Sequence, residues 1–535
     1  MSAPAAQTPT CIAIIGAGHV GGPTAVMIAH KCPHLKVLVT DANPRKLAAW
    51  QSDKPPVYEP GLKEVLQIVR GTNLFFTPDL PSVVRQAQLI FVAVTTPLKS
   101  AGIGAGMAPD VRFWESVARQ IGAVADEPKV VIERSTVPVR TARLMAQLLR
   151  PPVSKVRHEV LSNPSFFASG TALVDLASPD VVLIGGEDTP TGRAAVAALS
   201  SVYAHWVPMR NIKTSGVWSA ELAKLTANAF LAQRIASMNA ISAVCEASDA
   251  EVGEVAKAIG TDSRIGSKHL QAGIGFGGAC YPTHLRNLVY LCRHHDLPEV
   301  ASYWQAVLDM NTWQRERFTE EIVRTLFNTV AGKKIAVLGF AYKRDTSDIR
   351  ETPAKYVCAR LLDEGAELSI YDPQVSRTAI EQALGAAAGW QDVVIDDRPD
   401  VPTTPVSPGT AAARLLLAGS SAAAAEAARS AANAVKLSIE SDAYLACAGA
   451  HALVVLTDWD EFKTLDYSRI YGTMKRPCFV FDGRCILDAP ALRRIGFSVR
   501  AIGSAAHKVA APPPPPPASA ADLKIALQVS GPLDY

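Results

Sequence analysis

The sequence predicts an α/β protein in which two doubly wound domains are joined by a long central helix. From residue 11 to residue 184, short Val- and Ile-rich runs alternate with helix-length polar stretches. A proline-free segment with helical periodicity follows, and the strand pattern returns near Lys334. Buried parallel strands joined by crossover helices produce such runs, because both faces of each strand are covered.

Each expected element rests on a particular stretch of the chain. The strands of the first domain are expected at Cys11–Ile15, Leu35–Thr40, Leu89–Val94, Val130–Ile132, Val160–Leu161 and Val181–Ile184. The central helix is expected from Thr214 to Glu246, with one face formed by Leu222, Leu225, Ala229, Ala232 and Ile235. The strands of the second domain are expected at Ile335–Leu338, Leu368–Tyr371, Leu453–Thr457 and Phe479–Phe481.

The chain of 535 residues is too long for one core, so we divide it into segments. We expect a flexible N-terminus (1–10), a first domain (11–213), a central helical region (214–330), a second domain (331–504) and a Pro-rich disordered tail (505–535). An insertion is expected at about 400–440, where an Ala-rich stretch forms either an added helix or a flexible excursion. The tail contains Pro512–Pro517, which we interpret as a disordered spacer rather than a ligand for a proline-recognising domain.

Composition excludes several functional classes. The net charge of +3 is too small to indicate nucleic-acid or membrane-surface binding. No apolar run reaches the ~18 residues of a membrane span, and the N-terminus lacks the blocks of a secretory signal. The nine cysteines are an odd number without a C-x-x-C pair, which argues against a disulfide framework or a metal site. We therefore expect a cytoplasmic protein in a reducing compartment.

The segment Gly16-Ala17-Gly18-His19-Val20-Gly21 is the first candidate site. It follows the strand Cys11–Ile15 directly and precedes a helix-compatible stretch, which is the context in which a glycine loop binds a dinucleotide pyrophosphate. Asp41 ends the next strand, where a carboxylate binds ribose hydroxyls and repels a 2′-phosphate, so NAD is favoured over NADP. Lys46 could contact the adenosine ribose or be an ordinary exposed lysine. The alternative for the loop is a glycine turn without a ligand.

A second candidate site combines a cysteine with a lysine and an asparagine. The glycine run Gly273–Gly278 leads to Cys280, and Pro282 is suited to the start of a helix. Thiols at helix N-termini ionise more readily, so Cys280 is a candidate nucleophile, although a small buried side chain is the alternative. Lys224 and Asn228 share one helix face and could stabilise an oxyanion. The alternative is a solvated lysine beside a chance asparagine.

Several of these stretches together resemble the UDP-glucose 6-dehydrogenases of animals and plants. The matching segments occur in order between Cys11 and Ser504; they are Gly16–Thr24, Tyr58–Gly61, Ser135–Pro138, Glu221–Phe230, Gly275–Cys280 and Phe481–Arg484. The resemblance implies two Rossmann-like domains, the first binding NAD and the second a UDP-sugar. It also implies a dimer-forming central helix, in a homodimer or homohexamer.

The resemblance further implies a two-step oxidation of UDP-glucose. The C6 alcohol loses one hydride, the aldehyde forms a thiohemiacetal with Cys280, and a second hydride leaves a thioester that water hydrolyses to UDP-glucuronate. Lys224 and Asn228 would stabilise the oxyanion, and Thr136 would lie near the water and the nicotinamide. GDP-mannose and UDP-N-acetylmannosamine dehydrogenases share this chemistry, but the matches around Cys280 and Asn228 favour UDP-glucose.

The resemblance also assigns binding positions. Those for the cofactor are Gly16, Gly18, His19, Val20, Gly21, Asp41, Lys46, Thr95, Thr96, Pro97, Ser135, Thr136 and Arg350. Those for the substrate are Ser165, Phe166, Phe167, Ser169, Lys224, Asn228, Arg264, Gln271, Gly273, Phe276, Gly277, Tyr342, Lys343 and Arg484. Cationic groups among them suit a pyrophosphate ligand.

The sequence departs from the family where protons are handled. The family's two glutamates in NPEFLAEG are Ser165 and Ser169 here, and its CFQKD reads Cys280-Tyr281-Pro282-Thr283-His284. Gln271 replaces a further family lysine. His284 titrates in a range that suits a substitute base, together with Thr136. Two hypotheses follow: an active dehydrogenase, which we favour, or a weakened paralogue that binds NAD and UDP-sugar as a regulatory or assembly subunit.

Overall fold

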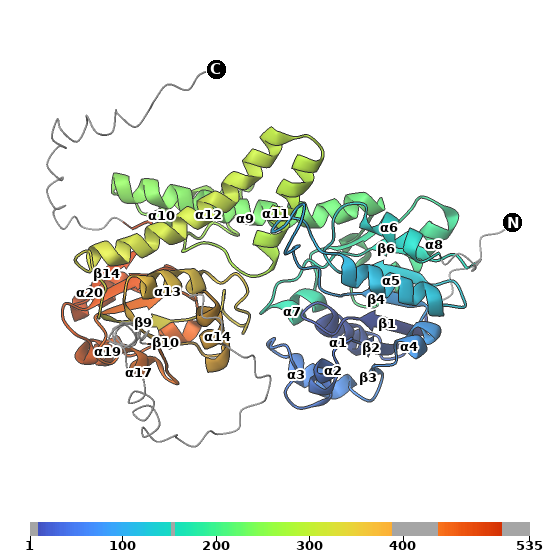
Figure 1. Ribbon diagram of the computed structural model, residues 1–535, viewed down its shortest axis with the longest axis horizontal. Coiled ribbons are helices and arrows are strands. Elements are labelled where there is room, and N and C mark those ends of the chain that lie inside the picture. Colours follow the sequence, from blue (N-terminus) through green and yellow to red (C-terminus); the bar gives the residue numbers. More distant parts are fainter. Residues whose placement is uncertain (1–8, 151–155, 388–436, 505–535) are drawn as a thin grey trace, which may run out of the picture.

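The computed structural model describes residues 9–150, 156–387 and 437–504. The expectations for residues 1–8, for most of the insertion at about 400–440 and for the tail at 505–535 lie outside the described residues. Within the described part, two α/β domains lie side by side, and one long helix of the central region runs along both (Figure 1).

The first domain is built on a sheet of order β3-β2-β1-β4-β5-β6-β7-β8. Its strands are β1 (Cys11–Ile15), β2 (Lys36–Thr40), β3 (Leu74–Phe76), β4 (Leu89–Val92), β5 (Val130–Glu133), β6 (Glu159–Ser162), β7 (Val182–Gly185) and β8 (Ile212–Ser215). Its helices are α1 (Gly21–Lys31), α2 (Pro44–Gln51), α3 (Leu62–Val69), α4 (Leu80–Gln86), α5 (Arg112–Val124), α6 (Thr141–Leu148), α7 (Ala172–Ala177) and α8 (Pro190–Tyr203), with the short turn η1 (Met209–Asn211). All five residues of β1 are buried, as a central parallel strand requires.

The expectation of an all-parallel first sheet is wrong at one position. β6 pairs with β7 in antiparallel direction through Ser162 and Gly185, whereas β7 pairs with β8 in parallel direction. The apolar runs could not reveal this reversal, because a short strand covered on both faces looks the same in either direction.

The second domain repeats the architecture with the sheet order β11-β10-β9-β12-β13-β14. Its strands are β9 (Lys334–Leu338), β10 (Glu367–Tyr371), β11 (Leu437–Ile439), β12 (Ala452–Val455), β13 (Phe479–Asp482) and β14 (Ser498–Ala501). Its helices are α13 (Pro353–Asp363), α14 (Arg377–Ala387), α17 (Ala443–Cys447), α18 (Asp460–Lys463), α19 (Tyr467–Thr473) and α20 (Ala489–Ile495). Every described strand pair in this sheet is parallel.

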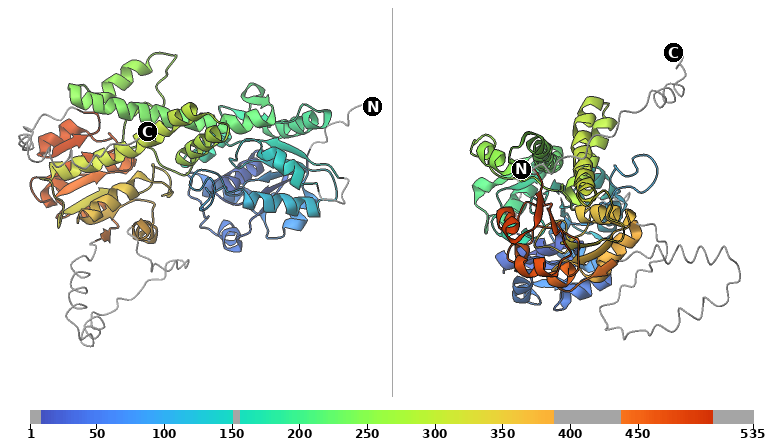
Figure 2. Two further views of the ribbon diagram at one scale, coloured as in Figure 1. Left: turned by 45° about the horizontal axis from the view of Figure 1, so that its top comes forward. Right: turned by 90° about the vertical axis from the view of Figure 1, so that its left-hand side faces the viewer.

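The central region consists of α9 (Val217–Ser248), α10 (Val252–Gly260), α11 (Cys280–His294) and α12 (Pro298–Thr325). The views agree that α9 extends along both domains and that α12 crosses it (Figure 2). Leu225, Ala229 and Ala232 are buried, as the expected apolar face requires, but Leu222 is 39% exposed. Helix α9 therefore buries a narrower apolar face than its periodicity indicates, and some of its apolar side chains are exposed to solvent.

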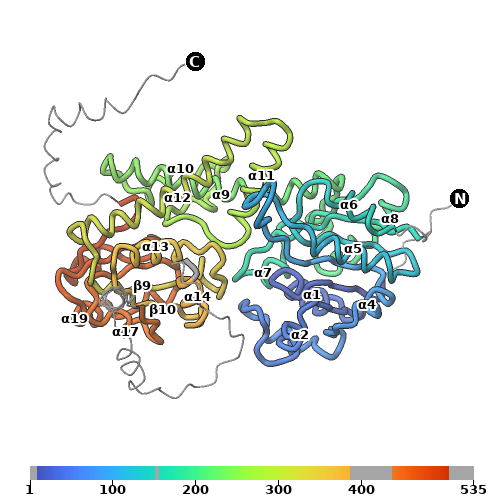
Figure 3. Tube along the Cα trace, in the orientation of Figure 1, coloured from blue at the N-terminus to red at the C-terminus, as the bar shows by residue number. Residues whose placement is uncertain are grey.

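Each sheet has one point at which its strand order reverses, and the candidate residues lie near these two points. In the first sheet the chain reverses its direction of growth between β1 and β4, and in the second between β9 and β12. Ligands of doubly wound sheets bind at such switch points, outside the carboxyl ends of the strands. The segment from Leu98 to Pro109, which follows β4, reaches α11, where Gly104 lies against Tyr290 (Figure 3).

Candidate active site

A cleft of about 1900 Å³, the interdomain cleft, lies between the two switch points. It is lined by loops of both sheets, by α9 and by the loop before α11. Most of the predicted site residues line it, namely Gly18, His19, Val20, Lys46, Thr95, Thr96, Pro97, Ser135, Thr136, Ser165, Phe166, Phe167, Ser169, Lys224, Asn228, Gln271, Gly273, Phe276, Gly277, Cys280, His284, Tyr342, Lys343, Arg350 and Arg484. Segments that are far apart in sequence thus form one site.

The glycine loop has the geometry of a dinucleotide cradle. Gly16 has a φ of 106°, and a Cβ there would lie 2.5 Å from the carbonyl oxygen of Ala93. A Cβ at Gly21 would overlap the carbonyl oxygen of Gly16, whereas Gly18 has nothing within 4 Å of its Cβ direction. Gly16 and Gly21 therefore allow the tight turn, and Gly18 leaves space for a phosphate beside the N-terminus of α1.

Asp41 fixes this loop from the end of β2. Its Oδ2 accepts hydrogen bonds from Ala17 N at 2.8 Å and from Lys46 Nζ at 3.1 Å. Gly16, Gly21 and Asp41 do not themselves line the cleft, because they form the layer beneath its wall. The residues present therefore fit NAD: a glycine cradle with open space, and a carboxylate beside it that would repel a 2′-phosphate.

The loop after β4 and the loop after β5 are tied together next to the cradle. Thr96 Oγ1 donates to Thr136 O at 2.8 Å, and Ser135 Oγ donates to Val94 O at 2.6 Å. These bonds hold Thr136 at the cleft wall. Ser135 and Thr136 thus lie where the cradle and the cysteine loop meet.

Cys280 is the first residue of α11 and is exposed in the cleft. The preceding loop is anchored on both sides: Phe276 N donates to Asn311 Oδ1 at 2.8 Å, and Ile274 N donates to Gly483 O at 2.9 Å. Gly278 has a φ of 79°, and a Cβ there would lie 2.8 Å from the Tyr342 ring. The thiol is therefore presented at a helix N-terminus by a rigid loop.

Lys224, Asn228 and His284 form a buried chain of contacts behind the thiol. Lys224 Nζ donates to Asn228 Oδ1 at 3.3 Å, and Asn228 Nδ2 lies 2.6 Å from His284 Nδ1. Burial lowers the pKa of Lys224 to about 8, with Cys280 opposing the decrease and Arg134 adding to it. Burial and the neighbouring Lys224 lower the pKa of His284 to about 3. His284 is therefore neutral at physiological pH.

The substrate side of the cleft is held by Arg484 and Tyr342. The Arg484 guanidinium donates to three carbonyl oxygens, those of Leu456 at 2.8 Å, Tyr342 at 2.8 Å and Gly275 at 3.4 Å. Burial raises the pKa of the Tyr342 phenol, and the Ser169 hydroxyl opposes this increase. Ser169 and Tyr342, which belong to different domains, thus line the same cleft. Gln271 Nε2 donates to Arg484 O at 3.0 Å.

Arg350 lies between the cradle and the thiol. Its guanidinium pairs with the Asp348 carboxylate at 2.6 Å, and both side chains act electrostatically on His19. His19 Nδ1 is buried without a hydrogen-bond partner among the described residues, and burial lowers the pKa of His19. The second domain therefore contributes a cation to the cofactor end of the cleft.

Sequence reasoning missed a buried pair of carboxyl groups, Glu133 and Glu221, at the start of α6. Glu221 on α9 accepts Arg140 N at 2.6 Å and Ala142 N at 2.8 Å, so it caps the start of α6. Glu133 is buried beside it, and burial together with the Glu221 charge raises the pKa of Glu133. Both residues lie in or next to stretches that the sequence analysis had singled out: Glu133 stands two residues before Ser135–Pro138, and Glu221 begins Glu221–Phe230. Only the fold shows that the two carboxyl groups lie together.

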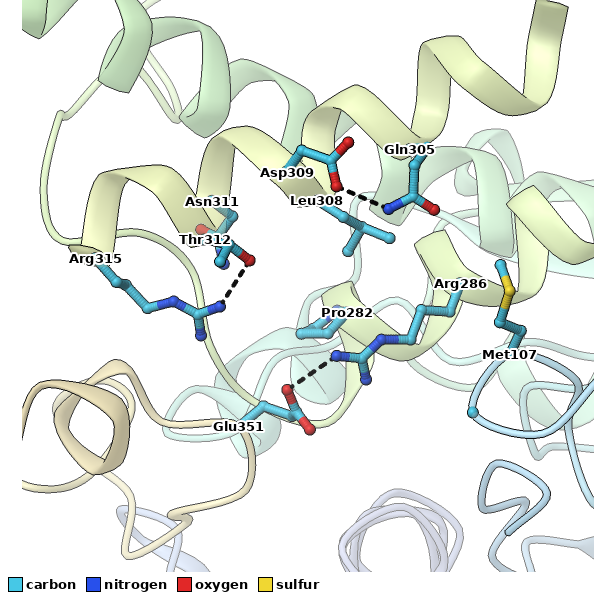
Figure 4. Close-up of a pocket in the computed structure, with 11 residues that line it drawn as sticks. Met107, Pro282, Arg286, Gln305, Leu308, Asp309, Asn311, Thr312, Arg315 and Glu351 are labelled. Atoms are coloured by element: carbon cyan, nitrogen blue, oxygen red, sulfur yellow. Dashed lines mark hydrogen bonds and ion pairs between the residues drawn. The ribbon is translucent and has the colours of Figure 1, made fainter. Parts of the chain in front are cut away.

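Arg264 is the predicted substrate-binding residue that does not line the cleft. Its side chain is 87% exposed and pairs with Asp262 at 2.6 Å. A separate cavity of about 260 Å³ lies behind the start of α11, between Pro282, Arg315 and the Arg286–Glu351 pair at 3.3 Å (Figure 4). Arg286 and Glu351 line the interdomain cleft as well, so this cavity adjoins it.

The fold and the cleft define a two-domain, dinucleotide-dependent oxidoreductase. Three family models match the chain along its length: the NAD binding domain (residues 10–207), the central domain (218–313) and the UDP binding domain (336–403 and 410–489) of the UDP-glucose/GDP-mannose dehydrogenase family. The chain belongs to the UDP-glucose/GDP-mannose dehydrogenase family.

Relatives from distant organisms match nearly the whole chain. The UDP-glucose 6-dehydrogenase of Caenorhabditis elegans is 49% identical over 496 residues, 92% of this chain and 95% of that one. UDP-glucose 6-dehydrogenase 5 of Oryza sativa subsp. japonica is 50% identical over 493 residues, 92% and 96% of the two chains. The fold matches that of a UDP-glucose dehydrogenase from the archaeon Pyrobaculum islandicum with a TM-score of 0.73 at 24% identity, covering 94% of this chain and 100% of the other.

Proposed function

We propose that the protein oxidises UDP-glucose to UDP-glucuronate with two molecules of NAD, through a thiohemiacetal and a thioester on Cys280. The observation that carries this proposal is the joint placement of an exposed thiol, a buried Lys224–Asn228 pair and a glycine cradle in one cleft. The animal and plant relatives at 49–50% identity bear the name of this activity.

The residues of the cleft divide the work between two ends. NAD, when bound, accepts a hydride from the substrate carbon in each of the two oxidations. Gly18 and the start of α1 would hold its pyrophosphate, with Arg350 and Thr95–Pro97 beside it. Lys343, Arg484 and the loop of Gly273–Gly277 would hold the UDP-sugar. Arg264, whose exposed side chain pairs with Asp262, is not among the residues that line this cleft.

At the reacting carbon, the chain's own groups handle charge and protons. The Cys280 sulfur adds to the C6 aldehyde, and the oxygen becomes an alkoxide next to the Lys224 ammonium and the Asn228 amide. These groups stabilise the negative charge, which is the usual role of an oxyanion hole. After the second hydride leaves, water adds to the thioester carbonyl, and the C–S bond breaks to return the Cys280 thiolate. One water molecule enters for every two hydrides removed.

The weakened-paralogue hypothesis remains the second candidate, because Ser165, Ser169 and His284 stand where family members carry carboxylates. Among the described residues, the groups that act electrostatically on Lys224 are Cys280 and Arg134, and neither is a carboxylate. Such a paralogue would bind both ligands and stop at the thioester.

Product analysis of three proteins separates these candidates. The native protein, a Cys280→Ala variant and a Cys292→Ala control are incubated with UDP-glucose and NAD, and the nucleotide sugars are identified by mass spectrometry. Cys292 is a buried thiol on the same helix, so it controls for the loss of a thiol. We expect UDP-glucuronate from the native protein and the control but not from Cys280→Ala. Binding of both ligands without any product would favour the regulatory subunit.

We also propose a homodimer or homohexamer that assembles through α9 and is located in the cytoplasm. Along α9, Trp218, Phe230 and Val244 are 46%, 54% and 59% exposed, which is unusual for such side chains on one helix. All nine cysteines are free thiols, as a reducing compartment favours. Among the described residues, no helix is long and apolar enough to cross a membrane. Light scattering of a Phe230→Asp variant tests the assembly, and a monomeric native protein would contradict it.

A further inference from the structure

The hydrogen bonds around Asn228 determine how its amide is oriented. Lys224 carries only donors on its ammonium group, so the Asn228 atom 3.3 Å from it must be the carbonyl oxygen. The amide nitrogen then necessarily faces His284, at 2.6 Å from Nδ1. Because an amide nitrogen can only donate, His284 Nδ1 must be an unprotonated acceptor.

This assignment fixes the state of the imidazole. A neutral ring with an unprotonated Nδ1 carries its proton on Nε2, so its basic nitrogen is already occupied by Asn228. Protonation of Nδ1 would place two donors 2.6 Å apart and would add a second cation beside Lys224. His284 is also buried, with 4% of its surface exposed, so water cannot compensate a charge there.

The surroundings of Asn228 make the His284 contact important for the orientation of its amide. Lys224 and Asn228 are 5% exposed each, and Phe166 covers the Lys224 ammonium with its ring centroid 5.2 Å away. Lys224 acts electrostatically on His284, and the groups that act on Lys224 are Cys280 on α11 and Arg134 after β5. No carboxylate among the described residues acts on Lys224 or His284. The neutral His284 Nδ1 is therefore the acceptor that holds the Asn228 amide nitrogen in place.

We propose that His284 is a positioning residue, which uses Nδ1 to hold the Asn228 amide in the orientation that supports Lys224, rather than a proton acceptor in the reaction. The inference rests on the proposed function for its kinetic consequences, but the geometry is independent of turnover. Substituting a histidine for the family aspartate thus keeps a hydrogen-bond acceptor at this position while removing a negative charge.

Two substitutions of His284 distinguish an acceptor from a base. His284→Ala leaves the Asn228 amide nitrogen without a partner and should lower kcat about 10- to 100-fold, the effect expected when a buried donor loses its acceptor. His284→Asn carries an oxygen at the same distance from Cβ as Nδ1, so it should recover most of the lost activity. His294→Ala, at the exposed end of the same helix, is the control.

The result that would overturn the proposal is a His284→Asn variant as inactive as His284→Ala, or a His284→Ala variant with native kcat. The pH profile adds a second test: the acidic limb of kcat should be the same in the native protein and His284→Asn, and its loss in the variant would identify His284 as the base.

An experiment without turnover tests the geometry itself. In protein labelled with ¹⁵N-histidine, the resonance absent from His284→Asn identifies His284. We expect an unprotonated Nδ1 and a protonated Nε2 that do not titrate between about pH 6 and 9. A protonated Nδ1, or titration within that range, would overturn the proposal. Absence of NADH formation by the native protein would reject the proposed function alone, because the ring state is measured separately.

Discussion

The charge of Lys224 should set an upper pH limit to activity, and this limit can be moved by a single substitution. Burial lowers the pKa of Lys224 from 10.5 to about 8. At about 1.4 kcal/mol per pKa unit, this change disfavours the ammonium by about 3 kcal/mol. The ammonium is the protonated form, so it is present below pH 8 and lost as the pH rises through this value. Because the ammonium stabilises the alkoxide, kcat/KM should fall above about pH 8 rather than above about pH 10.

The substitution His284→Asp tests the cause of this limit. A carboxylate within a few ångströms of an ammonium typically raises its pKa by about 1 to 3 units. The basic limb of kcat/KM should therefore move to higher pH by a similar amount, measured by NADH absorbance with UDP-glucose and NAD between about pH 6 and 10. His294→Asp, which adds the same charge far from Lys224, is the control. A basic limb at the same pH in His284→Asp and the native protein would refute the reasoning.

Three further predictions concern residues that support the cleft. Glu133→Gln should stabilise the protein at pH 8 by at least about 1 kcal/mol, because the pKa of Glu133 is raised in the folded state and its contribution to stability is lost as the pH rises above its pKa in the unfolded chain. The gain in Tm should therefore shrink towards pH 5. An equal gain at pH 5 and pH 8 would contradict this prediction. Gly278→Ala should lower kcat more than about 10-fold, because the added Cβ would meet the Tyr342 ring. Gly71→Ala is the control: Gly71 has a similar φ but open space around it, so this substitution should lower Tm through backbone strain and leave kcat unchanged. Asp41→Asn should raise the KM for NAD about 10-fold or more and reduce the preference for NAD over NADP. If the ratio of kcat/KM with NAD to kcat/KM with NADP is unchanged, Asp41 does not select the cofactor.

The sequence predicted the central strands well and the edges poorly. β1, β4 and β9 are continuous apolar runs because both of their faces are covered, and this pattern is visible in the sequence. β3, β8, β11 and β14 were missed. Each lies at the edge of its sheet or is partly exposed, so its residues do not form a fully apolar run. Helix α9 was predicted within a few residues of its observed bounds, Val217–Ser248, because no proline interrupts it.

The candidate site was predictable in its residue types but not in its contacts. The glycine cradle, Cys280 and the Lys224–Asn228 spacing are local patterns, and the cleft brings most of the predicted residues together. The contact between Asn228 and His284 joins residues 56 positions apart on two helices, so no spacing rule could reveal it. For the same reason, the sequence could show that His284 is titratable but not that burial lowers its pKa.

The most direct test of the account is the stoichiometry of the reaction. The native protein is given limiting UDP-glucose and excess NAD, and the NADH formed is compared with the UDP-glucose consumed. A four-electron oxidation that regenerates Cys280 predicts two NADH per UDP-glucose over many turnovers. A single burst limited to the amount of protein, with a UDP-sugar acyl adduct on Cys280 in its mass spectrum, would contradict the proposed turnover and identify a chain that stops at the thioester.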